Sequence, residues 1–198
     1  MAQEEIRAGR IYKVFKAKDG RKVTLRALRW DDLDDLLEMI NSLVEEGADI
    51  MVDREQTRDE ELNWLARALS EQEKKEKTYV AAEVKGKLMA NSQISRLGAG
   101  RQSHVGILGI AIRDGYRNIG IGTQMIKTRL DEGKKMGVKV LILDVFAGNR
   151  HAKHVFEKIG FREVGKIPKG IFKDGKYIDE VRMALDLETV MDLKVIEK

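Results

Sequence analysis

One stretch of sequence decides the fold: Ile110-Ala111-Ile112-Arg113-Asp114-Gly115-Tyr116-Arg117-Asn118-Ile119-Gly120-Ile121-Gly122-Thr123. It begins as an isoleucine-rich run typical of a β-strand, turns through a glycine-bearing loop and enters a helix near Thr123. Gly120 and Gly122 have no Cβ, so backbone N–H groups can approach a bulky anion closely. The helix directs its positive end at the same place, and Arg117 adds a fixed charge. The stretch therefore predicts a seat for a pyrophosphate.

The glycines alone leave a plain tight turn open as an alternative. A P-loop is excluded because no Gly-Lys-Ser/Thr follows. The dinucleotide fingerprint is excluded because Gly115, Gly120 and Gly122 have the wrong spacing. The hexapeptide Arg117-Asn118-Ile119-Gly120-Ile121-Gly122 instead resembles the Arg/Gln-x-x-Gly-x-Gly/Ala acetyl-CoA motif of the GCN5-related N-acetyltransferase (GNAT) family.

A second motif follows downstream. Val138 to Phe146 is an apolar run typical of a buried strand, and Gly148 and Asn149 end it. Apolar residues then recur at helical spacing up to Gly160, a typical helix C-cap. The family's second signature is a strand, Asn-x-x-Ala, a short helix and Gly-Phe. Here it reads Asn149-Arg150-His151-Ala152 and then Phe156-Glu157-Lys158-Ile159-Gly160-Phe161. With both motifs in order, the chain resembles this family over roughly residues 23–185.

The whole pattern predicts the order ββ-αα-βββ-α-β-α-ββ. The expected strands are Tyr12–Phe15, Lys22–Leu28, Thr78–Val84, Leu88–Arg96, Val105–Ile112, Val138–Phe146, Phe161–Ile167 and Tyr177–Leu185. The expected helices start at Asp31 or Asp32, at about Asp59, near Thr123 and at Asn149, and residues 186–198 form a helical tail. The second helix is expected to bury Leu62, Leu65, Ala66 and Leu69, and the last two strands to join through Pro168-Lys169-Gly170 and Asp174-Gly175. The resemblance implies an α/β (α+β) fold: one domain, residues 1–198, with a mixed, twisted central sheet of about seven strands and helices on both faces.

Composition narrows the function classes. With 42% hydrophobic residues and no apolar run of membrane-spanning length, we expect one core and a soluble, cytoplasmic protein without a membrane partner. The absence of cysteine excludes disulfides and thiol chemistry. His151 and His154 are three apart on a helix, which suits either a ligand pair or two solvent-facing residues; we expect the second and no metal. The 37 basic and 33 acidic residues indicate a mixed surface; without a basic stripe, no nucleic-acid partner is expected. The density of Lys, Arg and Glu, with charged residues at 35%, is typical of thermophile proteins.

The resemblance implies how acetyl-CoA binds. In this family two central parallel strands separate, and the pantetheine arm bonds the exposed backbone of one of them. The pyrophosphate takes backbone N–H groups at the start of the next helix. The implied coenzyme residues are Ile110, Ala111, Ile112, Arg117, Asn118, Ile119, Gly120, Ile121, Gly122, Thr123 (through its hydroxyl as well), Asn149 and Phe156. Asn149 alternatively serves only as a helix N-cap, and its one side-chain oxygen cannot fully satisfy both roles.

Two departures from the family pattern concern catalysis. Many members carry a tyrosine near the coenzyme sulfur as general acid, where this chain has Phe156, which cannot donate a proton. Tyr116, Tyr177 and Tyr79 remain unranked acid candidates. Some members carry a glutamate on the first motif's strand, but residues 104–112 contain no carboxylate.

Asp144 is the better candidate for a base acting through water, since members that acetylate ribosomal-protein N-termini carry a glutamate there. The alternative for Asp144 is a solvated or salt-bridged carboxylate. Glu83 is a weaker candidate, and its alternative is an outward-facing strand residue.

The implied reaction is acetyl transfer from acetyl-CoA to a primary amine by direct attack in a ternary complex. The acceptor is a protein N-terminus, an amino acid or a small amine. The acidic loop of residues 45–58 attracts a cationic amine or is only a solvated charge run. The final hairpin, residues 173–181, resembles the subgroup acting on ribosomal-protein N-termini and small amines. A non-catalytic acyl-CoA-binding sensor is the alternative. Many relatives dimerise through their last strands, which leaves a homodimer open.

Overall fold

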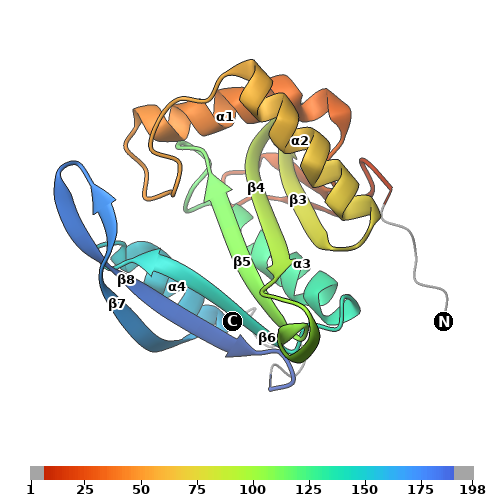
Figure 1. The fold of residues 1–198 in the computed structure, drawn as a ribbon. Coiled ribbons are helices and arrows are strands. Elements are labelled where there is room, and N and C mark those ends of the chain that lie inside the picture. Colours follow the sequence, from red (N-terminus) through yellow and green to blue (C-terminus); the bar gives the residue numbers. More distant parts are fainter. Residues whose placement is uncertain (1–6, 190–198) are drawn as a thin grey trace. The chain divides into compact units, whose positions relative to one another are not determined.

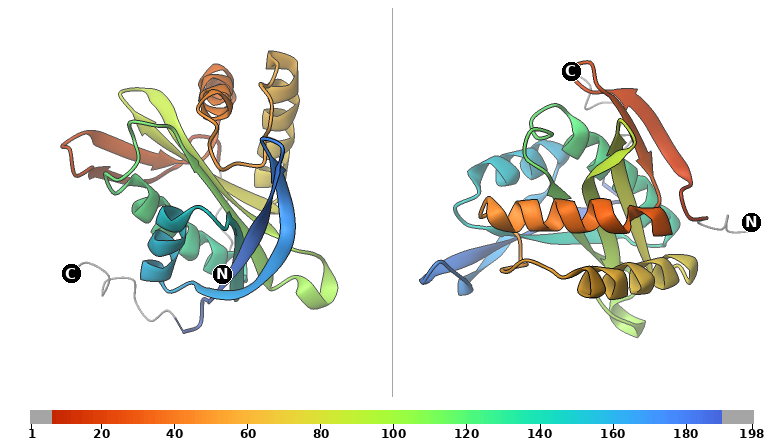
Figure 2. Two further views of the ribbon diagram at one scale, coloured as in Figure 1. Left: turned by 90° about the vertical axis from the view of Figure 1, so that its left-hand side faces the viewer. Right: turned by 90° about the horizontal axis from the view of Figure 1, so that it is seen from above.

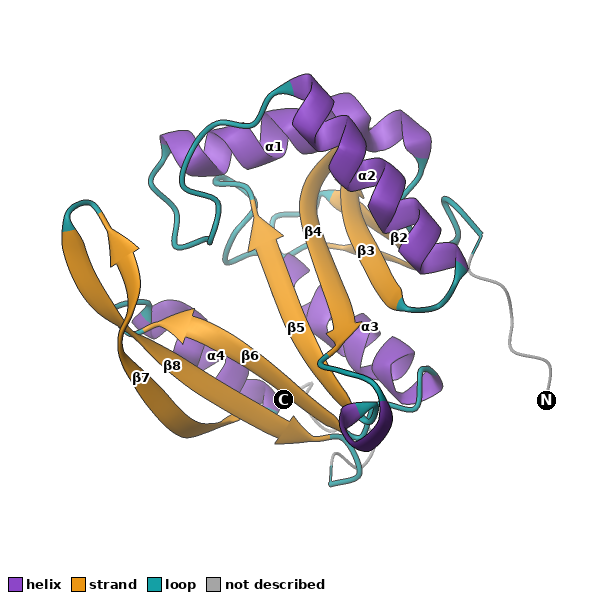
Figure 3. Ribbon diagram, in the orientation of Figure 1, coloured by secondary structure: helices purple, strands orange, loops and turns teal. Residues whose placement is uncertain are grey.

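The computed structural model describes residues 7–189, and Figures 1 and 3 show its helices and strands. The predicted order ββ-αα-βββ-α-β-α-ββ is confirmed. The strands are β1 Ile11–Lys16, β2 Lys22–Arg26, β3 Lys77–Val84, β4 Lys87–Arg96, β5 Val105–Ile112, β6 Val140–Phe146, β7 Arg162–Lys173 and β8 Lys176–Asp186. The helices are α1 Leu33–Glu45, α2 Arg58–Glu73, α3 Ile121–Lys135 and α4 Arg150–Ile159, with short 3₁₀ turns at Trp30–Asp32 and Gly100–Gln102. Most of the predicted helical tail, residues 190–198, lies outside the described residues.

The chain divides into two compact units. The first comprises Met1–Ser95 and Gly109–Glu132, and the second comprises Arg96–Leu108 and Gly133–Lys198. Strands follow the order β1-β2-β3-β4-β5 in the first unit and β5-β6-β8-β7 in the second. The β5–β6 pair is parallel, whereas β1–β2, β2–β3, β3–β4, β6–β8 and β7–β8 are antiparallel. The α/β fold with a mixed sheet is confirmed. Among residues 7–189 the sheet has eight strands, as the predicted order lists, rather than the about seven that the family resemblance implies.

In the first unit, helices cover both faces of the sheet (Figure 2). One face packs against α1 and α2 through a buried cluster that includes Leu36, Leu65 and Tyr79. The other face packs against the start of α3 through a cluster that includes Val23 and Met125. Strand side chains alternate between these two clusters, as period-2 geometry requires.

The buried face of α2 differs from the predicted one. Leu65 and Leu69 are buried as expected, but Leu62 is 37% exposed. The buried stripe instead runs through Glu61, Leu65, Ala68 and Gln72. Those positions recur every three or four residues, whereas Leu62 lies about 100° around the helix from Glu61. A buried carboxylate therefore occupies a position that the hydrophobic pattern alone would not select.

In the second unit, α4 begins and ends as predicted. Asn149 Oδ1 accepts the N–H of Ala152 at 3.0 Å, and Gly160 caps the other end with a φ of 111°. The final hairpin differs from the prediction at one place. The Asp174-Gly175 turn forms, but residues 168–170 lie within β7 as an irregularity of the ladder between Ile167 and Ile171. Such a bulge lets a strand continue past a proline that cannot join the ladder. Along the described part of the chain, no helix is both long and apolar enough to span a bilayer.

Candidate functional site

The loop between β5 and α3 has an unusual backbone. Gly115, Asn118 and Gly120 have φ values of 76°, 63° and 92°. Only glycine, and to a lesser degree asparagine, adopts this left-handed region at low cost. Gly120 O accepts the N–H of Gln124 at 3.1 Å, so the helix starts at Gly120–Ile121, two residues before the predicted position. The N–H groups of its first turn have no partner within the helix and are available to an anion.

The two motif glycines are required for different reasons. Gly120 has a positive φ, and a Cβ there would have Lys18 Cγ as its nearest atom at 4.0 Å. Its constraint is therefore conformational and not steric. A Cβ at Gly122 would lie 3.0 Å from Ile112 Cδ1, so this glycine lets the helix pack closely on the strand. The sequence reasoning assigned both glycines to anion access, and the structure adds a packing role for Gly122.

Arg117 is held by protein groups. Its Nε donates to Ile112 O at 2.8 Å, and its terminal nitrogen pairs with Glu46, just after α1. The side chain thus joins the end of β5 to the start of the acidic loop. Because Glu46 balances its charge, the loop's backbone N–H groups carry most of its capacity for an anion.

The strand residues Ile110, Ala111 and Ile112 are half-buried and alternate between the two sheet faces. Ile110 and Ile112 pack with the α3-side cluster, and Ala111 packs with the α1–α2 cluster. The Arg113 N–H donates to Met89 O at 3.0 Å and fixes the point where β5 ends.

The structure separates the three tyrosine candidates. Tyr79 is buried, donates its hydroxyl to Glu71 at 2.7 Å and has a pKa raised by burial, so it is committed within the core. Tyr116 is half-buried in the β5–α3 loop, residues 113–120, with the Arg21 guanidinium 4.3 Å from its ring centroid. Tyr177, in the second unit, is 67% exposed and lies 5.1 Å from the Phe172 ring, between centroids.

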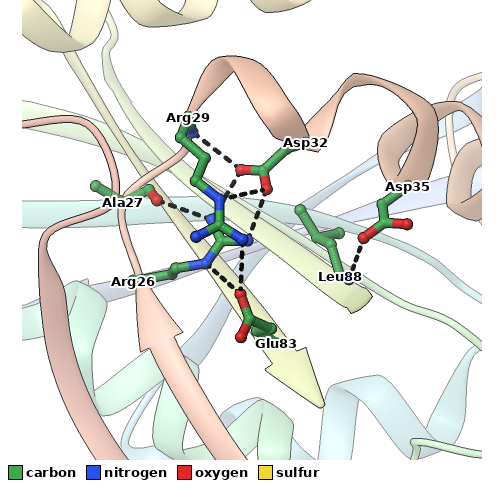
Figure 4. Close-up of polar contacts among 7 residues, drawn as sticks. All are labelled: Arg26, Ala27, Arg29, Asp32, Asp35, Glu83 and Leu88. Atoms are coloured by element: carbon green, nitrogen blue, oxygen red, sulfur yellow. Dashed lines mark hydrogen bonds and ion pairs between the residues drawn. The ribbon is translucent and has the colours of Figure 1, made fainter. Parts of the chain in front are cut away.

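Glu83 belongs to an ionic cluster (Figure 4). Arg26, only 2% exposed, donates to Glu83 at 2.8 Å and to both oxygens of Asp32 at 2.6 and 2.8 Å. Arg29 adds a bond to Glu83 at 3.2 Å. Asp32 stands at the N-cap position of α1, but its carboxylate serves these arginines and not the helix. Glu83 is therefore neither an outward-facing residue nor a free base, because it compensates a buried charge.

In the second unit, Asp144 is the exposed residue of an otherwise largely buried β6. Arg182 of β8 lies directly opposite and donates to both carboxylate oxygens at 2.8 and 2.9 Å. The Asp144 side chain is 25% exposed. Burial and the nearby Asp144 charge raise the pKa of Glu180. Asp144 thus forms a salt bridge, as one of its two interpretations from the sequence states, and its carboxylate is still accessible to solvent.

The second motif supplies one amide and one ring. Asn149 uses Oδ1 to cap α4, which leaves its Nδ2 hydrogens for another acceptor. Phe156 is 8% exposed and packs edge-on against Phe161, with ring centroids 5.6 Å apart. Among residues 7–189, no group of three or more histidine, aspartate or glutamate side chains could hold a metal ion.

A family model described as "Acetyltransferase (GNAT) family" matches residues 33–161, which include both motifs. The chain belongs to this family. Members of this family use acetyl-CoA as co-substrate. A curated relative, the L-methionine sulfoximine/L-methionine sulfone acetyltransferase of Pseudomonas paraeruginosa, is 25% identical over 79 residues, which are 40% of this chain and 46% of the relative. The matched segment thus spans about half the length of that GNAT relative.

Solved structures support the GNAT fold. A ribosomal-protein-alanine N-acetyltransferase from Brucella melitensis is 22% identical, with a TM-score of 0.74 over 82% of this chain and 98% of that one. A candidate acetyltransferase from Salmonella typhimurium, solved with its cofactor acetyl-CoA, is 18% identical with a TM-score of 0.74 over 86% of this chain and 96% of that one.

Proposed function

We propose that this GNAT protein is an enzyme that transfers the acetyl group of acetyl-CoA to a primary amine. The observation that carries the proposal is the β5–α3 loop, whose left-handed backbone at Gly115, Asn118 and Gly120 leads into the first turn of α3, where the N–H groups have no partner within the helix. An oriented set of backbone donors at a helix start suits a pyrophosphate.

Each motif, taken by itself, offers groups that suit the coenzyme. The N–H groups of Ile121, Gly122 and Thr123 meet the pyrophosphate, with those of residues 117–120 beside them. The backbone of residues 110–112 pairs with the pantetheine. Asn149 contributes its Nδ2 hydrogens, because its Oδ1 is already used as a cap. Phe156 supplies an apolar wall and no proton.

In the chemical step, the neutral amine attacks the thioester carbonyl carbon, and the C–S bond breaks as the tetrahedral intermediate collapses. The nitrogen must lose a proton, and the coenzyme leaves as a thiolate that takes a proton from solvent or from Tyr116 or Tyr177. We assign the proton acceptor to Asp144 acting through water. Its pairing with Arg182 fixes its orientation and occupies both carboxylate oxygens, which favours a relay through water.

Glu83 is the less suitable base. Its carboxylate compensates Arg26, which is almost completely buried. Protonating Glu83 during turnover would leave that guanidinium partly uncompensated, at a cost that a solvent-accessible carboxylate does not incur. The ionic cluster thus supports Asp144 over Glu83.

For the acceptor, we propose an amino acid, a small amine or a protein N-terminus. The relative that is named for methionine sulfoximine supports an amino-acid-like amine. The loop of residues 45–58 favours a cation less than its composition indicates. Glu46 pairs with Arg117, which balances one of the loop's acidic side chains.

The test is a calorimetric titration with acetyl-CoA, followed by thiol release with a panel of amino acids, small amines and short peptides. Binding with turnover on one class establishes the enzyme and its acceptor. Binding without turnover on any member of the panel moves the assignment to a coenzyme sensor. Absence of binding contradicts the proposed function.

A further inference from the structure

The hairpin formed by β1 and β2 precedes the segment that matches the family model, which begins at residue 33. In Figure 2 the tip of this hairpin lies beside the loop that leads into α3. The turn, residues 17–21, belongs to the same compact unit as the β5–α3 loop. This part of the chain therefore adds something to the site that neither motif contains.

Several contacts fix the turn against the loop. The Lys18 N–H donates to Ile119 O at 3.0 Å, and the Arg21 guanidinium donates to Gly115 O at 2.7 Å. The same guanidinium covers the Tyr116 ring at 4.3 Å from its centroid. The Lys18 N–H binds the carbonyl of Ile119, the residue before Gly120. The Lys18 side chain therefore starts beside the N–H groups at the beginning of α3.

The Lys18 side chain lies beside Gly120. Its Cγ is 4.0 Å from where a Cβ on Gly120 would stand, and the remaining side chain extends three bonds further to the ammonium. The residue is exposed, and no side-chain hydrogen bond or ion pair of Lys18 is found within residues 7–189.

Other cations around the loop are committed to protein partners. Arg21 is bound by Asp19 at 2.5 Å, Arg117 by Glu46, and Lys13 by Gln124 of α3 at 2.8 Å. The Lys18 side chain thus places beside Gly120 a positive charge that pairs with no other group among residues 7–189.

We propose that Lys18 binds a phosphate of the coenzyme and so completes the seat from outside the two motifs. The inference rests on the proposed function, because it names a further binding residue for the same co-substrate. The recognised chemistry is phosphate oxygen, which coenzyme A offers in its pyrophosphate and in its 3′-phosphate. A charge-assisted contact at this partly exposed position is expected to contribute about tenfold in affinity.

The experiment compares Lys18→Gln with Lys22→Gln. Lys22 is an exposed lysine of the same hairpin, and it neighbours Val23, which faces the α3-side cluster, so its own side chain points to the opposite face of the sheet. Both variants remove one positive charge. We expect Lys18→Gln to weaken acetyl-CoA binding about tenfold in calorimetry and to reduce its salt dependence, with Lys22→Gln within twofold of the parent. Both should melt within a degree or two of the parent, and Lys18→Arg should recover most of the affinity.

A second titration uses the 3′-dephospho form of acetyl-CoA. If the Lys18→Gln effect disappears with that ligand, Lys18 binds the 3′-phosphate; if it persists, Lys18 binds the pyrophosphate. If the parent protein binds acetyl-CoA and the two glutamine variants behave alike, the role of Lys18 is overturned and the proposed function stands. If the parent itself does not bind, the proposed function fails with it.

Discussion

Replacing Gly120 with alanine tests whether the left-handed backbone of the loop is what presents the anion seat. The substitution adds one methyl group at a residue whose φ is 92°. The nearest atom to that methyl is Lys18 Cγ at 4.0 Å, which is ordinary van der Waals contact, so no clash contributes. The perturbation is therefore almost purely conformational.

The size of the effect follows from the cost of positive φ. An L-residue in the left-handed region costs about 1–2 kcal/mol. If the loop relaxes to relieve this strain, binding must restore the strained form, and the coenzyme loses about 5- to 30-fold in affinity. If the loop stays strained, the same energy is lost from the free energy of unfolding. The two losses together should therefore account for about 1–2 kcal/mol.

Gly86→Ala is the matched control. Gly86 has a φ of 82°, and no atom lies within 4 Å of where an added Cβ would stand. It lies in the β3–β4 turn, outside the β5–α3 loop. Denaturant unfolding and calorimetric titration with acetyl-CoA should show destabilisation for Gly86→Ala with unchanged affinity. Gly120→Ala should show weaker binding, lower stability or both, and the two losses should sum to about 1–2 kcal/mol. Parent-like affinity together with parent-like stability in Gly120→Ala would refute the reasoning that this loop requires a left-handed residue at position 120.

Three further predictions concern other parts of the chain. Asp144→Asn should lower kcat at least tenfold in the thiol-release assay and change the acetyl-CoA dissociation constant less than twofold, since a base acts on the amine and not on coenzyme binding; a fully active variant removes Asp144 as base. Asp32→Asn should lower the free energy of unfolding by about 3–5 kcal/mol in a denaturant titration, because it removes the carboxylate that balances the buried Arg26. The control Asp34→Asn, at an exposed residue, should change that free energy little. Burial raises the pKa of Glu61 to about 6, so the folded chain binds this proton more tightly than the unfolded chain. Glu61→Gln should therefore gain about 2 kcal/mol over the parent above pH 6 and nothing below pH 4.5, and an equal gain at both pH values would contradict this account.

The parts of the site that sequence could predict are those set by local rules. Asn149, three residues before an apolar helical stripe, predicts a cap, and its oxygen does accept the Ala152 N–H. Gly160 predicts the helix end, and its φ of 111° is of the kind that glycine tolerates. The β5 strand follows from its isoleucine-rich run and has the predicted bounds. Each of these inferences needs only residues within one turn or one strand.

What sequence could not predict depends on residues far apart in the chain. Arg117 was expected to offer its charge to a ligand, but its partner Glu46 lies 71 positions away and nothing local identifies it. The sequence indicates a surface position for Glu83 because the pattern of its own strand does not show that the buried Arg26 of the neighbouring strand binds it. The hydrophobic stripe of α2 was misplaced for a related reason, since Glu61 takes a buried position that hydrophobicity assigns to an apolar neighbour.

The motif and its surroundings therefore contribute different things to anion binding. Gly120 permits a backbone that exposes the first N–H groups of α3, but a permissive backbone does not by itself hold a fixed shape. The shape is fixed by bonds from outside the motif: Lys18 N–H to Ile119 O, Arg21 to Gly115 O, and Glu46 to Arg117. Two of these bonds use arginines whose charges are balanced within the protein, Arg21 by Asp19 and Arg117 by Glu46. Affinity for a phosphate should then depend on backbone dipoles and on Lys18, and neutralising Arg21 should act mainly through the position of the loop.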